Sequence, residues 1–170
     1  IVVKEGSRDI INEAFRVLRS NMDFMAGKDK GQNVFVLTSF NPGSGKSFLT
    51  MNIAMSFAIK KKRILVIDGD LRHGSVSSYV DSPRIGLSDY LGNRVENWKE
   101  IIVADKKYDN LHILPIGTVP PNPTELLEDG KLATLIGALR GEYDYIFIDC
   151  PPIDIVADAQ IIEKLADRTI

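Results

Sequence analysis

The segment from Pro42 to Ser47 has the residue types and spacing of a phosphate-binding loop. Its glycines allow backbone N–H groups to turn towards phosphate oxygens, and a helix that starts at its end adds partial positive charge. Lys46 would contact the β- and γ-phosphates of a nucleotide, and the Ser47 hydroxyl would bind Mg²⁺. The predicted nucleotide-binding residues are therefore Pro42, Gly43, Ser44, Gly45, Lys46, Ser47 and the adjoining Phe48.

This loop departs from the usual pattern G-x-x-x-x-G-K-[ST], because Phe40 stands at the position of the first glycine. Pro42 and Gly43 would have to supply the turn instead. A plain polar connection between a strand and a helix is the simpler alternative. The apolar run before the loop and the helical pattern after it favour phosphate binding.

A pair of carboxylates, Asp68 and Asp70, follows the apolar run Ile64-Leu65-Val66-Ile67. The carboxyl ends of parallel strands are where open α/β sheets bind their ligands. The two side chains would share a face if the strand continued through both. One could then hold a metal while the other accepts a proton. An Asp-Gly-Asp turn without chemistry fits the same residues, so the pair alone decides nothing.

A further carboxylate, Asp149, closes the apolar run that begins at Tyr145. A strand-end aspartate of this kind can bind Mg²⁺ directly or through water. Alone it would more simply cap the following turn, which Pro151 and Pro152 enforce. Because a phosphate loop and two strand-end carboxylate motifs occur in this order, the sequence predicts binding of Mg²⁺ and a nucleoside triphosphate such as ATP.

The elements that must position these residues alternate between strand and helix. Continuously apolar runs predict strands at Asn33 to Ser39, Arg63 to Asp68, Leu111 to Ile116 and Tyr145 to Asp149, with another beginning at Thr169. Helices are predicted over residues 9–25, 46–60, 87–91, 98–103, 125–128, 132–139 and 157–166. In the first of these the predicted buried face carries Ile11, Ala14, Phe15, Leu18, Met22 and Met25. The pattern predicts an α/β fold in three layers, a mostly parallel sheet with helices on both faces, which we expect to be truncated at its C-terminus.

Composition sets limits on the class of protein. The 170 residues suit one domain, and 21 basic against 23 acidic residues give no surface charge typical of nucleic-acid binding. The single Cys150 fits a reducing cytoplasm, and no apolar run is long enough for a membrane-spanning helix. Because the chain starts without Met, we treat it as a fragment whose parent could still carry a membrane anchor.

The combined motifs resemble the bacterial tyrosine kinases, which are related to the MinD and ParA P-loop ATPases that position septa and partition DNA. The resemblance covers nearly the whole chain and includes the phosphate loop, the D-x-D-x-R motif of Asp68, Asp70 and Arg72, and Asp149. Two more segments match the kinases: Glu13-x-x-Arg16-x-x-Arg19, and the G-x-x-P-P-N-P-x-E-L-L pattern from Gly117 to Leu127. The ATPases usually have a signature lysine where this chain has Asn41.

The resemblance implies a P-loop NTPase fold and an ATP-dependent protein-tyrosine autokinase that regulates exopolysaccharide or capsule synthesis and export. It implies that Lys46, Asp68 and Asp70 are catalytic, with Asp68 activating the tyrosine hydroxyl, although the sequence does not separate Asp68 from Asp70. The Mg²⁺ ligands would be Ser47, Asp68 and Asp149, and Arg72 would contact phosphate or the acceptor.

The resemblance also implies partners. Glu13, Arg16 and Arg19 lie within one face of the first predicted helix, where simple intrahelical pairing is the alternative to an interface. The family's motif instead implies a ring-like homo-oligomer that phosphorylates in trans, so residues 1–27 would form an oligomerisation region and 33–170 the nucleotide-binding core of a single domain. The second partner would be a membrane-embedded chain-length regulator, fused or separate, which places this chain on the cytoplasmic side of the inner membrane. The family's C-terminal tyrosine cluster is absent from the sequence.

Two other functions stay open at this stage. One is a MinD- or ParA-like switch in which ATP binding drives dimerisation, against which the missing signature lysine argues. The other is a nucleotide-binding module that assembles without catalysis.

Overall fold

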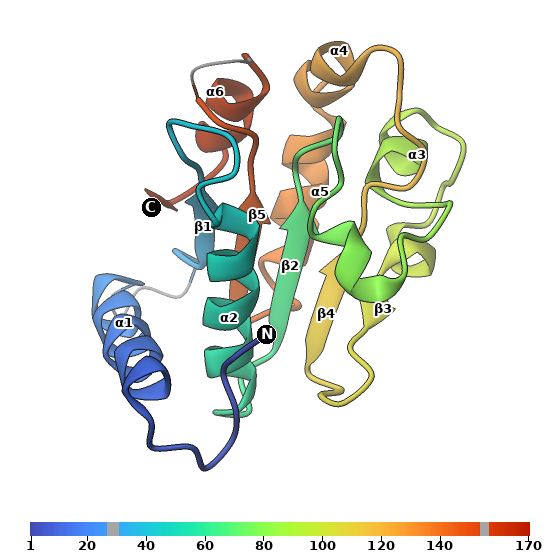
Figure 1. Cartoon of the computed structure of the whole chain (residues 1–170). Helices are drawn as coiled ribbons and strands as arrows, with labels where there is room; N and C mark the ends of the chain where they lie inside the picture. The colour runs from blue at the N-terminus through green and yellow to red at the C-terminus, as the bar shows by residue number, and fades with distance from the viewer. Residues whose placement is uncertain (27–30, 154–156) are drawn as a thin grey trace.

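The computed structural model describes residues 1–26, 31–153 and 157–170 and shows a six-stranded sheet between two layers of helices (Figure 1). The strands are β1 (Val34–Leu37), β2 (Ile64–Asp68), β3 (Val103–Ala104), β4 (Leu111–Leu114), β5 (Tyr145–Asp149) and β6 (Arg168–Thr169). Their order across the sheet is β3-β4-β2-β5-β1-β6, and every neighbouring pair is parallel except β3 with β4. The predicted mostly parallel sheet is confirmed.

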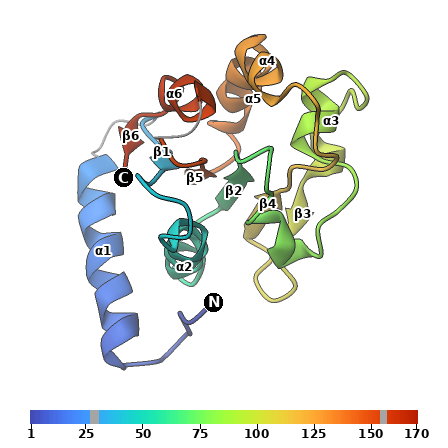
Figure 2. The same cartoon turned by 45° about the horizontal axis from the view of Figure 1, so that its top comes forward.

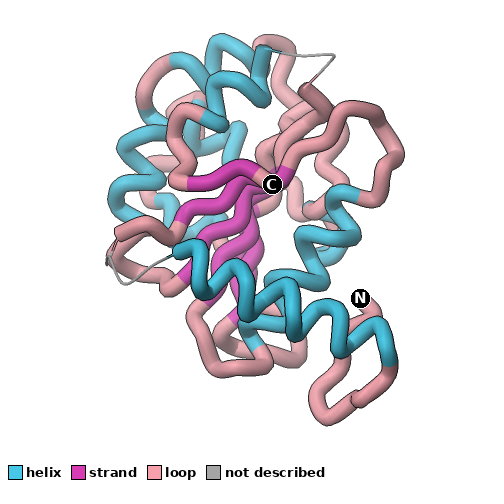
Figure 3. Tube along the Cα trace, turned by 90° about the vertical axis from the view of Figure 1, so that its left-hand side faces the viewer, coloured by secondary structure: helices cyan, strands magenta, loops and turns pink. Residues whose placement is uncertain are grey.

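The helices divide between the two faces of the sheet, as Figure 3 shows. Aromatic and aliphatic side chains of α1 (Ile10–Ala26) and α2 (Lys46–Ala58) pack in one buried cluster with one face of the strands. The opposite face is covered by α3 (Leu87–Leu91), α4 (Pro123–Glu128), α5 (Lys131–Leu139) and α6 (Ala157–Glu163). Two short 3₁₀ helices, η1 (Ser77–Val80) and η2 (Trp98–Ile101), complete the described elements. None of the described helices is both long and apolar enough to cross a bilayer.

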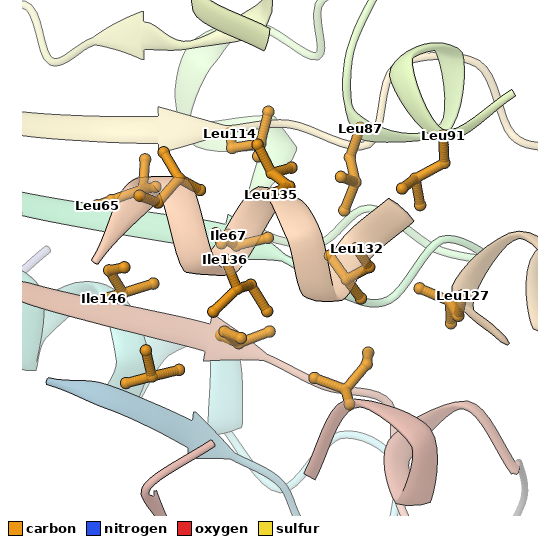
Figure 4. Close-up of a cluster of buried hydrophobic side chains, with 14 of the residues drawn as sticks. Leu65, Ile67, Leu87, Leu91, Leu114, Leu127, Leu132, Leu135, Ile136 and Ile146 are labelled. Carbon is orange, nitrogen blue, oxygen red and sulfur yellow. The ribbon is translucent and has the colours of Figure 1, made fainter. Parts of the chain in front are cut away.

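The central strands are apolar throughout because both of their faces are covered. Along β2, Ile64 and Val66 belong to the cluster under α1 and α2, whereas Leu65 and Ile67 belong to the cluster under α5. Figure 4 shows this second cluster, in which Leu132, Leu135 and Ile136 of α5 lie over Leu65, Ile67, Leu114 and Ile146 of three strands. This packing fixes the position of each strand along its own axis. It therefore also fixes the place of the residue at the carboxyl end of each strand.

The register between β2 and β5 matters most for function. Asp68, the last residue of β2, lies directly beside Asp149, the last residue of β5. The backbone N–H of Gly69 donates to the carbonyl of Asp149 at 2.8 Å, and a Cβ on Gly69 would lie 3.0 Å from that carbonyl oxygen. A residue without a side chain therefore lets the two strand ends stay in contact.

The structure corrects four points about individual elements. The segment from residue 98 holds a 3₁₀ helix followed by β3, which pairs antiparallel at the edge and is too short to leave a pattern. The strand predicted to Ile116 ends at Leu114, and η1 went unrecognised. The first helix buries a narrower line than predicted, since Phe15, Met22 and Ala26 are buried but Ile11, Ala14 and Met25 are exposed.

Candidate nucleotide-binding site

The phosphate loop connects β1 to the first turn of α2 and lies at the carboxyl ends of the strands (Figure 1). Gly43 has a φ of 71° and Gly45, the residue before α2, a φ of 86°. Both values lie in the left-handed region that glycine adopts without steric cost. The turn falls at Pro42 and Gly43, so a glycine at position 40 is not needed, and Phe40 is 70% exposed.

A cavity of about 630 Å³ opens over this loop. It is lined by all of the predicted loop residues and, from the loop after β2, by Asp70, Arg72, His73 and Ser75; Ser39, Pro151 and Pro152 complete it. Asp68 and Asp149 do not line the cavity, because both are completely buried at the strand ends. The sheet thus brings together the predicted residues: the loop and the largely buried Asp70 line the cavity, and Asp68 and Asp149 lie in the interior beside it.

Asp149 joins the ends of β5 and α2. Its Oδ1 lies 3.0 Å from the Lys46 ammonium, and its Oδ2 accepts a hydrogen bond of 2.6 Å from the Ser47 hydroxyl. The hydroxyl of Thr50, one helical turn further along α2, donates to Oδ1 at 3.0 Å. Sequence reasoning missed Thr50, although its spacing from Lys46 and Ser47 places it on the same face of the helix. One buried carboxylate therefore holds both side chains expected to bind phosphate and metal.

Asp68 is bonded on one oxygen only. Its Oδ2 accepts hydrogen bonds from the backbone N–H and the hydroxyl of Ser77, each 2.7 Å long. Its Oδ1 is the only fully buried side-chain oxygen or nitrogen in the described residues that lacks a partner. Burial raises the pKa of the Asp68 carboxyl to about 6, against the two hydrogen bonds from Ser77, and the charges of Asp149 and Asp70 add to the increase.

This orphaned oxygen is the observation that fits a metal ion. A buried, unpaired carboxylate oxygen beside a second carboxylate is costly, and a divalent cation nearby would remove that cost. Mg²⁺ usually takes only one or two carboxylates and completes its shell with water and substrate phosphates. The donors at this place, with Ser47, suit that requirement; among the described residues there is no group of three or more His, Cys, Asp or Glu side chains that could hold a metal alone.

Asp70 has a different environment. Its Oδ1 accepts from the backbone N–H groups of Arg72 at 3.2 Å and His73 at 3.3 Å, and the His73 imidazole lies 3.0 Å from Oδ2. Because β2 ends at Asp68, the strand does not continue through both carboxylates. Asp70 therefore shapes the loop at the cavity wall, while Asp68 keeps an uncommitted oxygen.

Arg72 lines the cavity, and two side chains outside the cavity lining hold its guanidinium group in place. Its Nε donates to Asp158 on α6 at 3.0 Å, and its Nη2 donates to the Thr124 hydroxyl at 3.2 Å. Thr124 in turn donates to Asp158 at 2.6 Å, and Asp158 is almost completely buried. Sequence reasoning overlooked Asp158, which carries no motif of its own. Thr124 belongs to the segment from Gly117 to Leu127, so that segment contacts the site through Arg72.

Glu13, Arg16 and Arg19 lie on α1, away from the cavity and beside α2 (Figure 2). Arg16 pairs with Glu13 on the same helix and also donates to the backbone carbonyl of Ser7. Arg19 donates to the carbonyl of Ser56 at 2.8 Å, which ties α1 to α2. Glu13 and Arg16 pair with each other but remain partly exposed at the surface.

The raised pKa of Asp68 leads to a prediction about stability. Below the unfolded-state pKa the carboxyl is protonated in both states, and as pH rises through the folded pKa of about 6 the folded protein carries the cost of a buried charge. Asn carries no such cost. In metal-free full-length protein, Asp68→Asn is expected to raise the free energy of unfolding at pH 8 by about 1–3 kcal/mol, and by less at pH 5.

Thermal unfolding in the presence of a chelator measures this difference at both pH values. Asp129→Asn, an exposed aspartate beyond the end of α4, is the matched control and should change little at either pH. An Asp68→Asn variant that is less stable than the wild type at pH 8 would contradict the argument.

Comparison with known proteins shows which proteins this chain resembles. Residues 32–164 match the protein family described as AAA domain. Tyrosine-protein kinase CpsD of Streptococcus pneumoniae is 37% identical over 160 residues, which are 93% of this chain and 68% of CpsD. EpsB of Ralstonia solanacearum is 40% identical over 156 residues, which are 91% of this chain but only 20% of EpsB. The chain thus spans about a fifth of the longer of these relatives.

Solved structures give the same picture. The kinase domain of Escherichia coli tyrosine kinase ETK superposes with a TM-score of 0.89 at 29% identity, covering 97% of this chain and 64% of that chain. The septum site-determining protein MinD of Pyrococcus horikoshii, solved with Mg-ADP, gives a TM-score of 0.68 at 27% identity over 81% of this chain and 56% of its own. The similarity is therefore more extensive to the kinase domain than to the ATPase.

Proposed function

Because this chain belongs to the bacterial tyrosine kinase family, we propose that its site transfers the γ-phosphoryl group of Mg²⁺–ATP to a tyrosine hydroxyl. The observation that carries the proposal is the convergence of Lys46 and Ser47 on Asp149, with the free oxygen of Asp68 at the adjacent strand end. These are the groups that phosphoryl transfer requires for positioning and for stabilising charge.

The residues of the loop bind and orient the triphosphate. The first backbone N–H groups of α2 have no acceptor within the helix. They belong to residues that line the cavity, at the end of the helix where its dipole favours negative charge. Lys46, which is paired with Asp149, would exchange that partner for the β- and γ-phosphates when ATP enters. Its charge then stabilises the transition state, in which negative charge is spread over the transferred group.

Ser47, Asp149 and Asp68 would hold Mg²⁺, a role that the orphaned Asp68 oxygen and the Ser47–Asp149 contact support. When bound, Mg²⁺ neutralises charge on the β- and γ-phosphates. Asp68 would also accept the proton of the incoming tyrosine, and Asp70 would keep its loop in place beneath the cavity wall. Arg72, held by Asp158 and Thr124, would contact the phosphates or the acceptor from the side.

The tyrosines of this chain are poor candidates for the acceptor, because all but one of them are buried. Tyr90, Tyr108, Tyr143 and Tyr145 are buried, and only Tyr79, which is 36% exposed, reaches the surface. A buried hydroxyl cannot enter the active site of a neighbouring subunit without unfolding its own core. We therefore propose autophosphorylation in trans on a segment that this chain does not contain.

Self-assembly would use α1. Its exposed side carries apolar residues, with Ile10 86% and Phe24 88% exposed and Val17 between them at heptad spacing, next to Glu13 and Arg16. Exposed apolar residues in one line beside charged ones are typical of an interface. We propose that this surface forms a ring-like homo-oligomer, in which the acceptor segment of one subunit reaches the site of the next.

Full-length protein with Glu13→Ala and Arg16→Ala is expected to dissociate at least tenfold more readily into monomers, because the interface loses its charged contacts. Light scattering over a concentration series measures the dissociation, and autophosphorylation should fall with it while ATP affinity stays unchanged. Arg84→Ala, an exposed arginine remote from α1, is the control. Unchanged association of the double variant would exclude this surface.

A membrane-embedded chain-length regulator is the partner that we propose for the whole protein, which would act in exopolysaccharide or capsule synthesis and export. The 20% coverage of EpsB supports a fused arrangement in some relatives, and the 68% coverage of CpsD a separate one in others. In either arrangement this chain would lie on the cytoplasmic side of the inner membrane.

The test of the proposed activity is to incubate the full-length protein with γ-labelled ATP and Mg²⁺ and to identify the labelled amino acid after acid hydrolysis. Phosphotyrosine is expected, and a chelator should abolish the labelling. Label confined to serine or threonine, or no labelled residue at all, would refute the proposal.

A MinD-like ATPase switch is the second candidate, supported by the structural similarity to MinD. Its signature lysine position is occupied by Asn41 in this chain. The switch predicts release of inorganic phosphate without phosphotyrosine. A module without catalysis would leave every measured activity unaffected by Asp68→Asn.

A further inference from the structure

A buried serine, Ser77, contacts the Asp68 carboxylate beside the site. Ser77 begins η1 and is almost completely buried, although no motif marks it. We infer that Ser77 is the positioning residue for Asp68, and that its hydroxyl sets which carboxylate oxygen is presented to the reacting groups. The inference rests on the proposed role of Asp68.

The hydrogen bonds around Ser77 define the direction of its proton. The Ser77 Oγ accepts from the backbone N–H of Ile116 at 2.9 Å and lies 2.7 Å from Asp68 Oδ2. A hydroxyl has one hydrogen, and a carboxylate can only accept, so that hydrogen points to Asp68. The contact with Ile116 therefore leaves the hydroxyl as a donor with a fixed orientation.

The Asp68 carboxylate becomes asymmetric as a result. Both the hydroxyl and the backbone N–H of Ser77 donate to Oδ2, and neither donates to Oδ1. Two short donors on one oxygen hold the carboxylate in one rotamer, and such hydrogen bonds to an ionised group are strong. Oδ1 is left without a partner and is the oxygen available for the tyrosine proton or the metal shell.

Ser77 also links parts of the chain that are distant in sequence. Ile116 follows β4, Asp68 ends β2, and Ser77 lies between these two strands in the sequence, at the start of η1. A residue that holds a catalytic side chain in its productive rotamer is expected to affect the rate of the chemical step more than the affinity of the enzyme for its substrate. Ser77 does not line the cavity over the phosphate loop, so loss of its hydroxyl should not remove a contact to ATP.

Ser77→Ala in the full-length protein is expected to lower kcat for tyrosine phosphorylation about tenfold and to change KM for ATP and the affinity for a non-hydrolysable ATP analogue by less than about twofold. Ser77→Thr keeps the hydroxyl and is expected to restore at least half of the wild-type kcat. Ser56→Ala is the matched control, because Ser56 is equally buried but its hydroxyl bonds only to a backbone carbonyl within α2.

A buried serine with a purely structural role gives a different pattern. It predicts equal losses of thermal stability for Ser77→Ala and Ser56→Ala with unchanged kcat in both at a temperature well below unfolding. That result would overturn the inference, as would a Ser77→Thr variant as slow as Ser77→Ala. Asp68→Asn, measured in the same assays, distinguishes failure of this inference from failure of the proposed function. If Asp68→Asn keeps full activity, the proposed role of Asp68 is wrong, irrespective of the results for Ser77.

Discussion

Replacing Lys46 with Met is expected to reduce tyrosine phosphorylation by about 10²–10³-fold. Lys46 is nearly buried against Asp149 and is the one lysine that lines the cavity over the phosphate loop among the described residues. Without its charge, the β- and γ-phosphates lose the cation that compensates them in the transition state. Initial rates with γ-labelled ATP, together with ATP affinity by calorimetry, measure the change.

The control for this variant is Lys60→Met, which removes the same charge from an exposed position just past the end of α2. It should leave rate and ATP affinity within about twofold of the wild type, because the position lies beyond the C-terminal end of α2, opposite the end that adjoins the phosphate loop. Equal effects of the two substitutions would show that only the overall charge matters, and the assignment of Lys46 would fail.

Replacing Asp68 with Asn is expected to lower kcat by about 10²–10³-fold, the range typical for loss of a general base. Asn keeps the shape of the side chain and can still accept from Ser77, but it cannot take up the tyrosine proton. ATP affinity should change much less than kcat, because the loop that binds the phosphates is intact and Ser47 and Asp149 would still hold Mg²⁺. Single-turnover rates and equilibrium binding on the same preparation separate the two quantities.

This variant has an internal control. The same substitution is expected to raise the stability of the metal-free protein at pH 8, so lost activity cannot then be ascribed to unfolding. Asp129→Asn gives the comparison at an exposed position. Activity of Asp68→Asn close to that of the wild type would support a nucleotide-binding module without catalysis.

The layers of this fold could be predicted because strands that are buried on both faces consist of continuous apolar runs. The runs Ile64 to Ile67 and Tyr145 to Ile148 contain no polar residue, and each proved to be a central parallel strand. β3 has two residues and one neighbour, so neither length nor periodicity could reveal it. The exposed side of α1 was also misjudged, because helical periodicity cannot distinguish a face that contacts the core from one that stays at the surface.

The site was predictable where spacing along the chain determines position. The loop residues from Pro42 to Phe48 all line one cavity, as consecutive residues of a tight turn must. Ser77, Thr50 and Asp158 were not found, because each meets its partner through packing between different elements and none of them belongs to a recognisable motif. The sequence also could not distinguish the surroundings of Asp68 from those of Asp70, and the structure shows that Asp68 has a buried oxygen without a partner.

The most direct test of the central claim follows the fate of the labelled γ-phosphate in the full-length protein. Label in phosphotyrosine and label in inorganic phosphate are measured in the same reaction over time, for the wild type and for Lys46→Met and Asp68→Asn. Wild-type protein is expected to transfer label to tyrosine, and both variants are expected to lose this product. Label released as inorganic phosphate with none on tyrosine would contradict the central claim and would favour an ATPase switch.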